Sequence, residues 1–99
     1  MLVLVHPFPF SAEIYAEDVE ALAGRVEILT PNVRGFGGAA PFDASTPPSI
    51  DAMADDVARL LDERGRAEPV VVGGLSMGGY VALAFARRHP ARLRGLVLA

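Results

Sequence analysis

Hydrophobic positions along the chain form short continuous runs that alternate with longer segments of helical spacing. The short runs are apolar at nearly every position, which is typical of strands that a parallel sheet buries on both faces. They lie at residues 2–5, 26–29, 70–72 and 96–99. The helical segments between them lie at residues 12–23, 50–64 and 77–88.

The clearest helix follows Ser49, at the end of a loop over residues 31–49 that is rich in glycine and proline. Its apolar positions fall on one helical face: Ile50, Met53, Ala54, Val57, Leu60 and Leu61. Ser49 can cap the helix, Asp51 suits its first turn, and Gly65 ends it. The preceding loop is long enough to suggest a function, because loops of that length without regular structure are uncommon in compact domains.

The other two helices have weaker signals at their ends. Ser11 is the expected N-cap of the helix over residues 12–23, and Gly24 is its expected stop. The helix over residues 77–88 is apolar on nearly every side and ends at His89, before a proline. Alternation of strands and helices predicts an α/β domain with a parallel sheet and helices on both faces.

Composition narrows the class of protein. The chain has 99 residues, which fits one domain over residues 1–99, and its 52% hydrophobic content predicts a folded core. Absence of cysteine excludes a disulfide scaffold and a thiol nucleophile, and two histidines are too few for a zinc cluster. All nine basic residues are arginine, which excludes both a P-loop lysine and a Schiff-base lysine.

Charge and hydropathy exclude further partners. The net charge of −3 leaves no basic surface for nucleic acid. The longest uncharged stretch, residues 69–86, approaches the length of a membrane span, but its glycines and serine indicate a buried strand that turns into a helix. We therefore expect no membrane segment, no metal and no organic cofactor. With no cysteine and no signal peptide, a cytoplasmic location is expected.

The strongest chemical signal is Gly74-Leu75-Ser76-Met77-Gly78, a G-x-S-x-G motif between a predicted strand and a predicted helix. This is the setting of a nucleophile elbow, a turn so tight that the residues two before and two after the serine must lack bulk. The turn lifts the Ser76 hydroxyl above the sheet and directs N–H groups at the helix start toward an oxyanion. A glycine-rich turn with an incidental serine is the alternative.

A second glycine motif has a simpler explanation. Residues 35–40 match the G-x-G-x-x-A dinucleotide fingerprint and follow a strand. They do not open a helix, because Pro41, Pro47 and Pro48 follow, so no pyrophosphate-binding turn is expected.

Three motifs in order resemble the α/β-hydrolase family over essentially the whole chain. Residues 6–9 (HPFP) resemble its His-Gly-x-Pro loop, residues 31–37 resemble its Asp-x-Arg-Gly-x-Gly loop, and the elbow follows. The resemblance implies that Ser76 is the nucleophile and that the backbone N–H groups of Phe8 and Met77 form the oxyanion hole. It also implies a four-stranded sheet in the family order 4-3-5-6. Esterases, lactonases and non-haem haloperoxidases look most similar.

Two positions depart from the family pattern. Pro7 stands where glycine is usual, and proline restricts φ to about −65°, which changes how the loop approaches an oxyanion. Asn32 stands where aspartate is usual, so Arg34 lacks a neighbouring charge there. Arg34 is expected to hold its loop in place, and the resemblance makes His6 a residue that positions its own loop. The alternative is that His6 acts as a base for Ser76, which requires their two strands to be neighbours and the imidazole to reach the hydroxyl.

The remaining triad residues have no counterpart in these 99 residues. The family order is serine, acid, histidine, yet the last acidic residue is Glu68 and the only later histidine is His89. His89 lies thirteen residues after Ser76, about 20 Å along one helix, too far to act as its base. The chain begins with a strand that resembles the family's third and ends on Ala99 inside a strand, so it is expected to be a fragment.

Two functions follow from this pattern. The first is a part of a serine hydrolase that acts on a small-molecule ester or lactone through an acyl-enzyme on Ser76, with the missing C-terminal part of the domain required for activity. The second is a non-catalytic hydrolase-like scaffold or binding domain. Within the first, esterase, lactonase, haloperoxidase and carbon–carbon bond hydrolase stay open.

Overall fold

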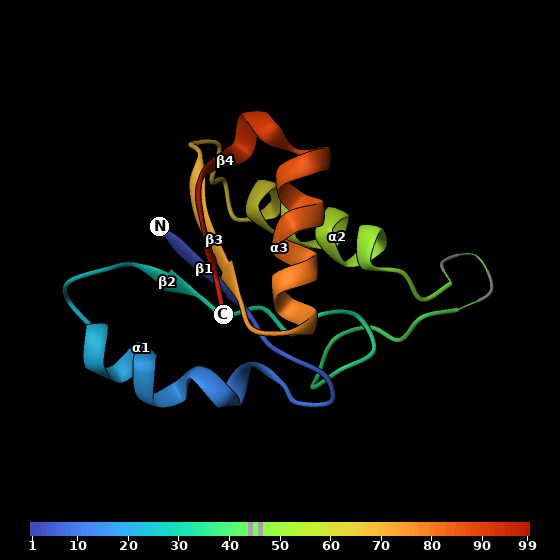
Figure 1. The fold of residues 1–99 in the computed structure, drawn as a ribbon, viewed down its shortest axis with the longest axis horizontal. Helices are drawn as coiled ribbons and strands as arrows, with labels where there is room; N and C mark the ends of the chain where they lie inside the picture. Colours follow the sequence, from blue (N-terminus) through green and yellow to red (C-terminus); the bar gives the residue numbers. More distant parts are fainter. Residues whose placement is uncertain (44, 46) are drawn as a thin grey trace.

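The computed structural model contains a four-stranded sheet and describes residues 1–43, 45 and 47–99 (Figure 1). Its strands lie in the order β2-β1-β3-β4, and each neighbouring pair is parallel. They are β1 (Leu2–Val5), β2 (Ile28–Leu29), β3 (Val70–Gly74) and β4 (Leu93–Leu98). Both the α/β class and the strand order implied by the resemblance are confirmed.

The helices follow the strands in alternation. They are the 3-10 helix η1 (Ala12–Tyr15), α1 (Ala16–Leu22), α2 (Ile50–Glu63), α3 (Met77–Arg88) and the 3-10 helix η2 (Pro90–Arg92). The connection from β1 to β2 runs in one direction along the sheet, and those to β3 and β4 run in the other. Because such crossovers are right-handed, α1 lies on one face and α2 and α3 lie on the opposite face.

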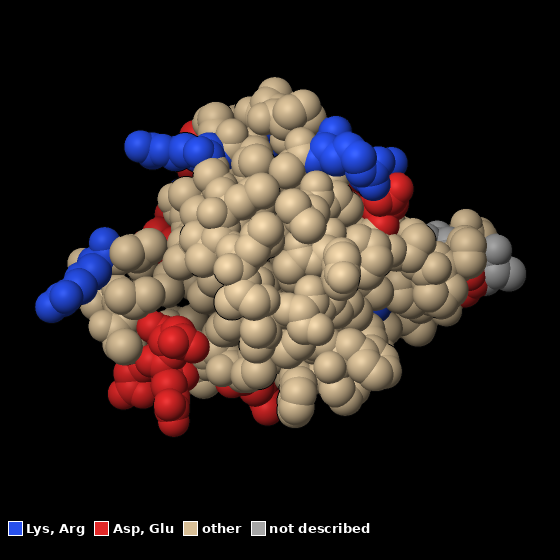
Figure 2. All heavy atoms as spheres, viewed as in Figure 1, with Lys and Arg blue, Asp and Glu red and all other residues tan. Residues whose placement is uncertain are grey.

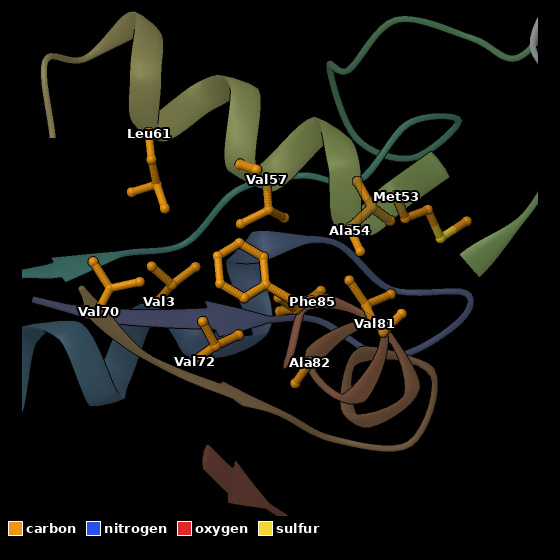
Figure 3. Close-up of a cluster of buried hydrophobic side chains, with 14 residues drawn as sticks. Val3, Met53, Ala54, Val57, Leu61, Val70, Val72, Val81, Ala82 and Phe85 are labelled. Atoms are coloured by element: carbon orange, nitrogen blue, oxygen red, sulfur yellow. The ribbon is translucent and has the colours of Figure 1, made fainter. Parts of the chain in front are cut away.

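The core lies between the sheet and the pair α2 and α3 (Figure 3). The side chains of Val3 and Val72 point from the strands toward Phe85 of α3, and α2 closes the layer with Val57 and Leu61. All five are nearly or fully buried. This is the apolar face of the helix predicted after Ser49. The Ser49 hydroxyl accepts a hydrogen bond from the Ala52 N–H (2.9 Å), which confirms the predicted N-cap.

The first helix differs from its prediction. Residues 12–15 form a 3-10 turn, the α-helix covers only Ala16–Leu22, and the Ser11 side chain makes no capping hydrogen bond. The Ala12 N–H is instead bonded by the Asn32 side-chain oxygen at 2.7 Å. The Asn32 side chain thus ties the start of η1 to the loop after β2.

Three predicted strands differ in their extent, and the third runs two residues further, to Gly74. The second is shorter, because the N–H groups of Arg25 and Val26 bond back to Leu22 at the end of α1. The fourth begins three residues earlier than predicted, where Leu93 pairs with Val70 across an irregularity in register. Its side chains are largely exposed, so the expectation of burial on both faces is wrong for β4.

The third helix is apolar on two sides but buried on one. Val81, Ala84 and Phe85 of α3 are buried, whereas Tyr80 and Leu83 are exposed. The loop predicted over residues 31–49 has no helix or strand at its described positions, and residues 44 and 46 lie outside the described ranges.

Candidate active site

The backbone turns sharply between β3 and α3. Ser76 stands at the N-cap of α3 with φ 55° and ψ −115°, and it is the one non-glycine residue with positive φ in the described ranges. This backbone conformation is sparsely populated for a residue with a side chain and costs about 1–3 kcal/mol. The motif predicted to form a tight strand–turn–helix therefore does so.

Two glycines allow this turn. A Cβ atom on Gly74 would lie 2.1 Å from the carbonyl of Gly78, and one on Gly78 would lie 1.9 Å from the Val5 carbonyl oxygen. Real Cβ atoms essentially never approach so closely, so any side chain at either position would displace backbone. The requirement for small residues on both sides of Ser76 is thus steric, and it involves β1 as well as the elbow.

The Ser76 side chain is exposed and makes no hydrogen bond to any other described residue. Its backbone is tied on both sides: the N–H donates to the Ala99 carbonyl (3.3 Å), and the carbonyl accepts from the Tyr80 N–H (3.2 Å). The elbow thus holds its backbone in place and leaves the hydroxyl free for another group.

Two backbone amides near the ends of β1 and β3 have no internal acceptor. Phe8 follows β1 in a turn that is closed by a hydrogen bond from the Phe10 N–H to the Pro7 carbonyl (3.0 Å). Neither the Phe8 N–H nor the Met77 N–H donates a hydrogen bond within the described part of the chain. The Met77 amide opens α3, where the helix dipole favours a negative charge.

His6 holds two loops together. It is fully buried, its Nε2 accepts a hydrogen bond from the Val33 N–H (3.1 Å), and its Nδ1 lies 3.0 Å from the Pro7 carbonyl oxygen. The ring also packs edge-on against Phe36. Since both nitrogens serve the backbone, His6 has none left to accept a proton from Ser76, and its role is to position loops.

The loop after β2 is tied to two helices. Arg34 forms a bidentate ion pair with Asp56 of α2 (2.7 and 2.8 Å), so it fastens the loop as expected. This hydrogen bonding to Asp56 raises the pKa of Arg34. Asn32 bonds the first amide of η1, so the residue that replaces the usual aspartate has a contact of its own.

An aspartate–histidine pair does exist, but it lies at the far end of α3. The His89 Nε2 is 2.7 Å from Asp55 of α2, which also receives two hydrogen bonds from Arg88. Hydrogen bonding from Arg88, with a smaller contribution from His89, lowers the pKa of Asp55 to about 2. His89 follows the last residue of the helix that Ser76 opens, as the sequence predicted. The pair therefore joins two helices and does not serve the elbow.

Two other kinds of site are absent from the described ranges. No cluster of acidic and histidine side chains there could hold a metal ion, and none of the helices has the length and hydropathy needed to cross a bilayer. A cavity of about 200 Å³ lies between the loop after β2 and α2, and its lining includes neither the elbow nor residues 6–9.

Sequence reasoning missed two contacts that shape this region. Asp56, the partner of Arg34, looks like any polar residue on the outer face of α2. Tyr15, whose hydroxyl donates to the Val5 carbonyl at 2.8 Å, looks like an ordinary aromatic residue of its helix. No local signal marks either one, because each partner belongs to another element.

Comparison with known proteins agrees with this geometry. The family described as "Alpha/beta hydrolase family" matches residues 2–99. Lipase 3 from Moraxella sp. is 31% identical over 98 residues, which are 98% of this chain and 30% of the lipase. A thermophilic esterase from Thermogutta terrifontis superposes with a TM-score of 0.92 at 41% identity, over 98% of this chain and 35% of the esterase.

A second solved structure, of an enzyme described as degrading N-acyl homoserine lactones, has a TM-score of 0.87 at 30% identity. It matches 98% of this chain and 36% of its own length. The chain thus spans about a third of the length of the proteins it matches.

Proposed function

The chain belongs to the alpha/beta hydrolase family, and from this premise we propose that it supplies Ser76 as the nucleophile of a serine hydrolase acting on a small-molecule ester or lactone. The observation that carries the proposal is the exposed Ser76 at positive φ between β3 and α3. Similarity to a lipase, an esterase and a lactone-degrading enzyme supports this substrate class.

The proposed reaction has two steps. Ser76 Oγ attacks the carbonyl carbon of the substrate while a histidine takes its proton, and the ester oxygen leaves as an alcohol when that proton is returned. Water then attacks the acyl-serine, which releases the acid and restores the serine hydroxyl. With a lactone, the alcohol and the acyl group belong to one molecule, so the hydroxyl stays attached throughout and the second step releases a hydroxy acid.

The oxyanion of both tetrahedral intermediates would be bound by the N–H groups of Phe8 and Met77. Three observations support these donors: both lack an internal acceptor among the described residues, they follow the adjacent parallel strands β1 and β3, and Met77 opens a helix. The carbonyl of Pro7 closes the turn around Phe8, so the proline at the usual glycine position is compatible with an ordered loop. Loss of one such donor typically costs about 10²–10³-fold in kcat.

The histidine base and its acidic partner would come from a longer polypeptide that contains residues 1–99. His6 is occupied by backbone groups, and His89 pairs with Asp55 beyond the far end of α3. In this fold the acid and the histidine follow the nucleophile in sequence. The chain spans about a third of its relatives' length, which leaves room for both.

The surface of the chain also supports a covering segment. Figure 2 shows a broad uncharged area over α3 and β4, with charged side chains at its margins. Exposed apolar side chains on these elements and the elbow are Leu75, Tyr80, Leu83, Leu96, Val97 and Leu98. Contiguous apolar surface normally marks an interface. We infer that the remainder of the domain covers this face and is required for turnover.

A serine-directed fluorophosphonate probe tests the proposal on the natural polypeptide that contains residues 1–99. We expect stoichiometric labelling that Ser76→Ala abolishes, with a fall of at least about 10³-fold in hydrolysis of an activated ester. Ser49→Ala, at the cap of α2, should label as the wild type does. Residues 1–99 alone should show little turnover, because neither histidine of the described residues is available as a base for Ser76.

A non-catalytic scaffold is the competing function. It is favoured by one observation: neither histidine of the described residues is available to Ser76. If the natural polypeptide neither reacts with the probe nor hydrolyses esters, or if labelling persists in Ser76→Ala, the serine hydrolase proposal is wrong.

A further inference from the structure

The end of β1 and the start of α3 meet at one carbonyl group. A Cβ atom on Gly78 would lie only 1.9 Å from the Val5 oxygen, so the backbone of the elbow packs directly against this oxygen. Val5 precedes the loop that carries Phe8, and Gly78 follows Met77. The position of this carbonyl therefore affects the spacing between the two free amides.

Tyr15, the last residue of η1, holds the same carbonyl from another side. Its hydroxyl donates to the Val5 oxygen at 2.8 Å. Burial raises the pKa of Tyr15, while hydrogen bonding from the backbone of Leu75 lowers it by a smaller amount. This hydroxyl thus holds the strand end that precedes Phe8 and that packs against Gly78 of the elbow.

We propose that Tyr15 is a positioning residue of the proposed hydrolase, whose hydroxyl sets the spacing between the oxyanion-binding amides of Phe8 and Met77. The inference rests on the proposed function of Ser76. Tyr15 touches neither the nucleophile nor, in this proposal, the substrate. It acts through the Val5 carbonyl, which precedes the Phe8 loop and packs against Gly78, the residue after Met77.

A hydroxyl suits this task better than an apolar ring. A hydrogen bond to a carbonyl is directional and restrains both distance and angle. The half-buried phenol stays protonated over the ordinary pH range because its pKa is raised, so it remains a donor. An isosteric phenylalanine would keep the packing of the ring and lose only this restraint.

The effect should appear in catalysis and not in binding. Oxyanion contacts are stronger in the transition state than in the ground state, so misplaced amides lower kcat and leave KM nearly unchanged. Because both donors stay in place and only their spacing relaxes, we expect a fall of about 10-fold for Tyr15→Phe. This is smaller than the loss of about 10²–10³-fold expected when a donor is removed.

The experiment compares Tyr15→Phe with Ser49→Ala in the natural polypeptide. Ser49 caps α2 and has no part in the proposed site, so its variant controls for the loss of one hydroxyl and its hydrogen bond. Ester hydrolysis gives kcat and KM, and thermal unfolding gives Tm. We expect Tyr15→Phe to keep a Tm within a few degrees of the wild type while kcat falls, and Ser49→Ala to lower Tm by a few degrees while kcat stays at the wild-type value.

Three results would overturn the inference: an unchanged kcat in Tyr15→Phe, a rise in KM alone, or loss of folding, which would mean that the hydroxyl supports the whole fold. A Ser76→Ala arm separates this failure from that of the proposed function. If turnover depends on Ser76 and Tyr15→Phe is fully active, only the positioning role is wrong. If turnover does not depend on Ser76, both proposals are wrong.

Discussion

Ser76 combines strain with exposure. A residue with a side chain at φ 55° is destabilised, yet the elbow keeps it there because the backbone on both sides is hydrogen-bonded. Backbone strain of this kind serves a reactive residue, because the turn that causes it also holds the Ser76 hydroxyl clear of the sheet. At the residue scale the sequence predicted this turn, because the two glycines of the motif reflect the lack of space on either side of Ser76.

Gly78→Ala tests that requirement. Its added methyl group would meet the Val5 carbonyl oxygen, which is backbone and cannot rotate away. We expect a loss of about 3 kcal/mol or more in the free energy of unfolding. Urea denaturation of the natural polypeptide measures it.

Gly38→Ala is the matched control for this substitution. Nothing lies within 4 Å of a Cβ atom at Gly38, so its stability should stay within about 0.5 kcal/mol of the wild type. Equal stability of the two variants would contradict the close contact between the elbow and β1.

At the scale of elements, α2 and the first helix show when a local signal is sufficient. Both were predicted to begin at a serine cap, and only Ser49 caps its helix with its side chain. The Ser11 side chain caps no amide, and the neighbouring Ala12 N–H is bonded by Asn32, twenty residues away. Propensity alone does not separate the two serines, because the choice depends on what else lies near the helix start.

The two serines make a direct comparison. We expect Ser49→Ala to lose about 1 kcal/mol in the free energy of unfolding, because the Ala52 N–H loses its acceptor. Ser11→Ala should lose less than about 0.5 kcal/mol, since its hydroxyl makes no capping bond. Chemical denaturation of both variants gives the difference, and an equal loss would show that Ser11 caps its helix after all.

The ion pairs between α2 and α3 also make the free energy of unfolding depend on pH. Asp55 has a pKa of about 2 in the folded chain, below its ordinary value of 3.8, because Arg88 and His89 stabilise the carboxylate. A lowered folded-state pKa stabilises the fold above about pH 4, and that contribution is lost as pH falls through about 2.

Asp55→Asn should remove this contribution. The ion pairs are well exposed, so we expect a loss of less than about 1 kcal/mol at pH 7, reduced further by salt. Between pH 4 and pH 2 the variant should lose less stability than the wild type. Denaturation curves across this range measure the slope. Glu17→Gln, on exposed α1, is the control, and an unchanged slope in Asp55→Asn would contradict the assignment.

At the scale of the whole molecule, the sheet order was predictable and the burial of β4 was not. Strand order follows from a family resemblance carried by three motifs. Burial of a strand depends on what packs against it, and the described residues leave Val97 53% and Leu98 51% exposed. The uncharged face in Figure 2 is therefore where the proposed remainder of the domain has to pack.

The sequence by itself determined the alternation of strands and helices and the sharp turn at Ser76. Both depend on sterics and hydrophobic spacing within a few residues, so a short stretch of sequence is enough to predict them. Only the tertiary structure decided which polar groups meet: His6 with Val33, Arg34 with Asp56, and Tyr15 with Val5. These partners lie 10 to 27 residues apart, and each hydrogen bond forms only after packing brings their elements together.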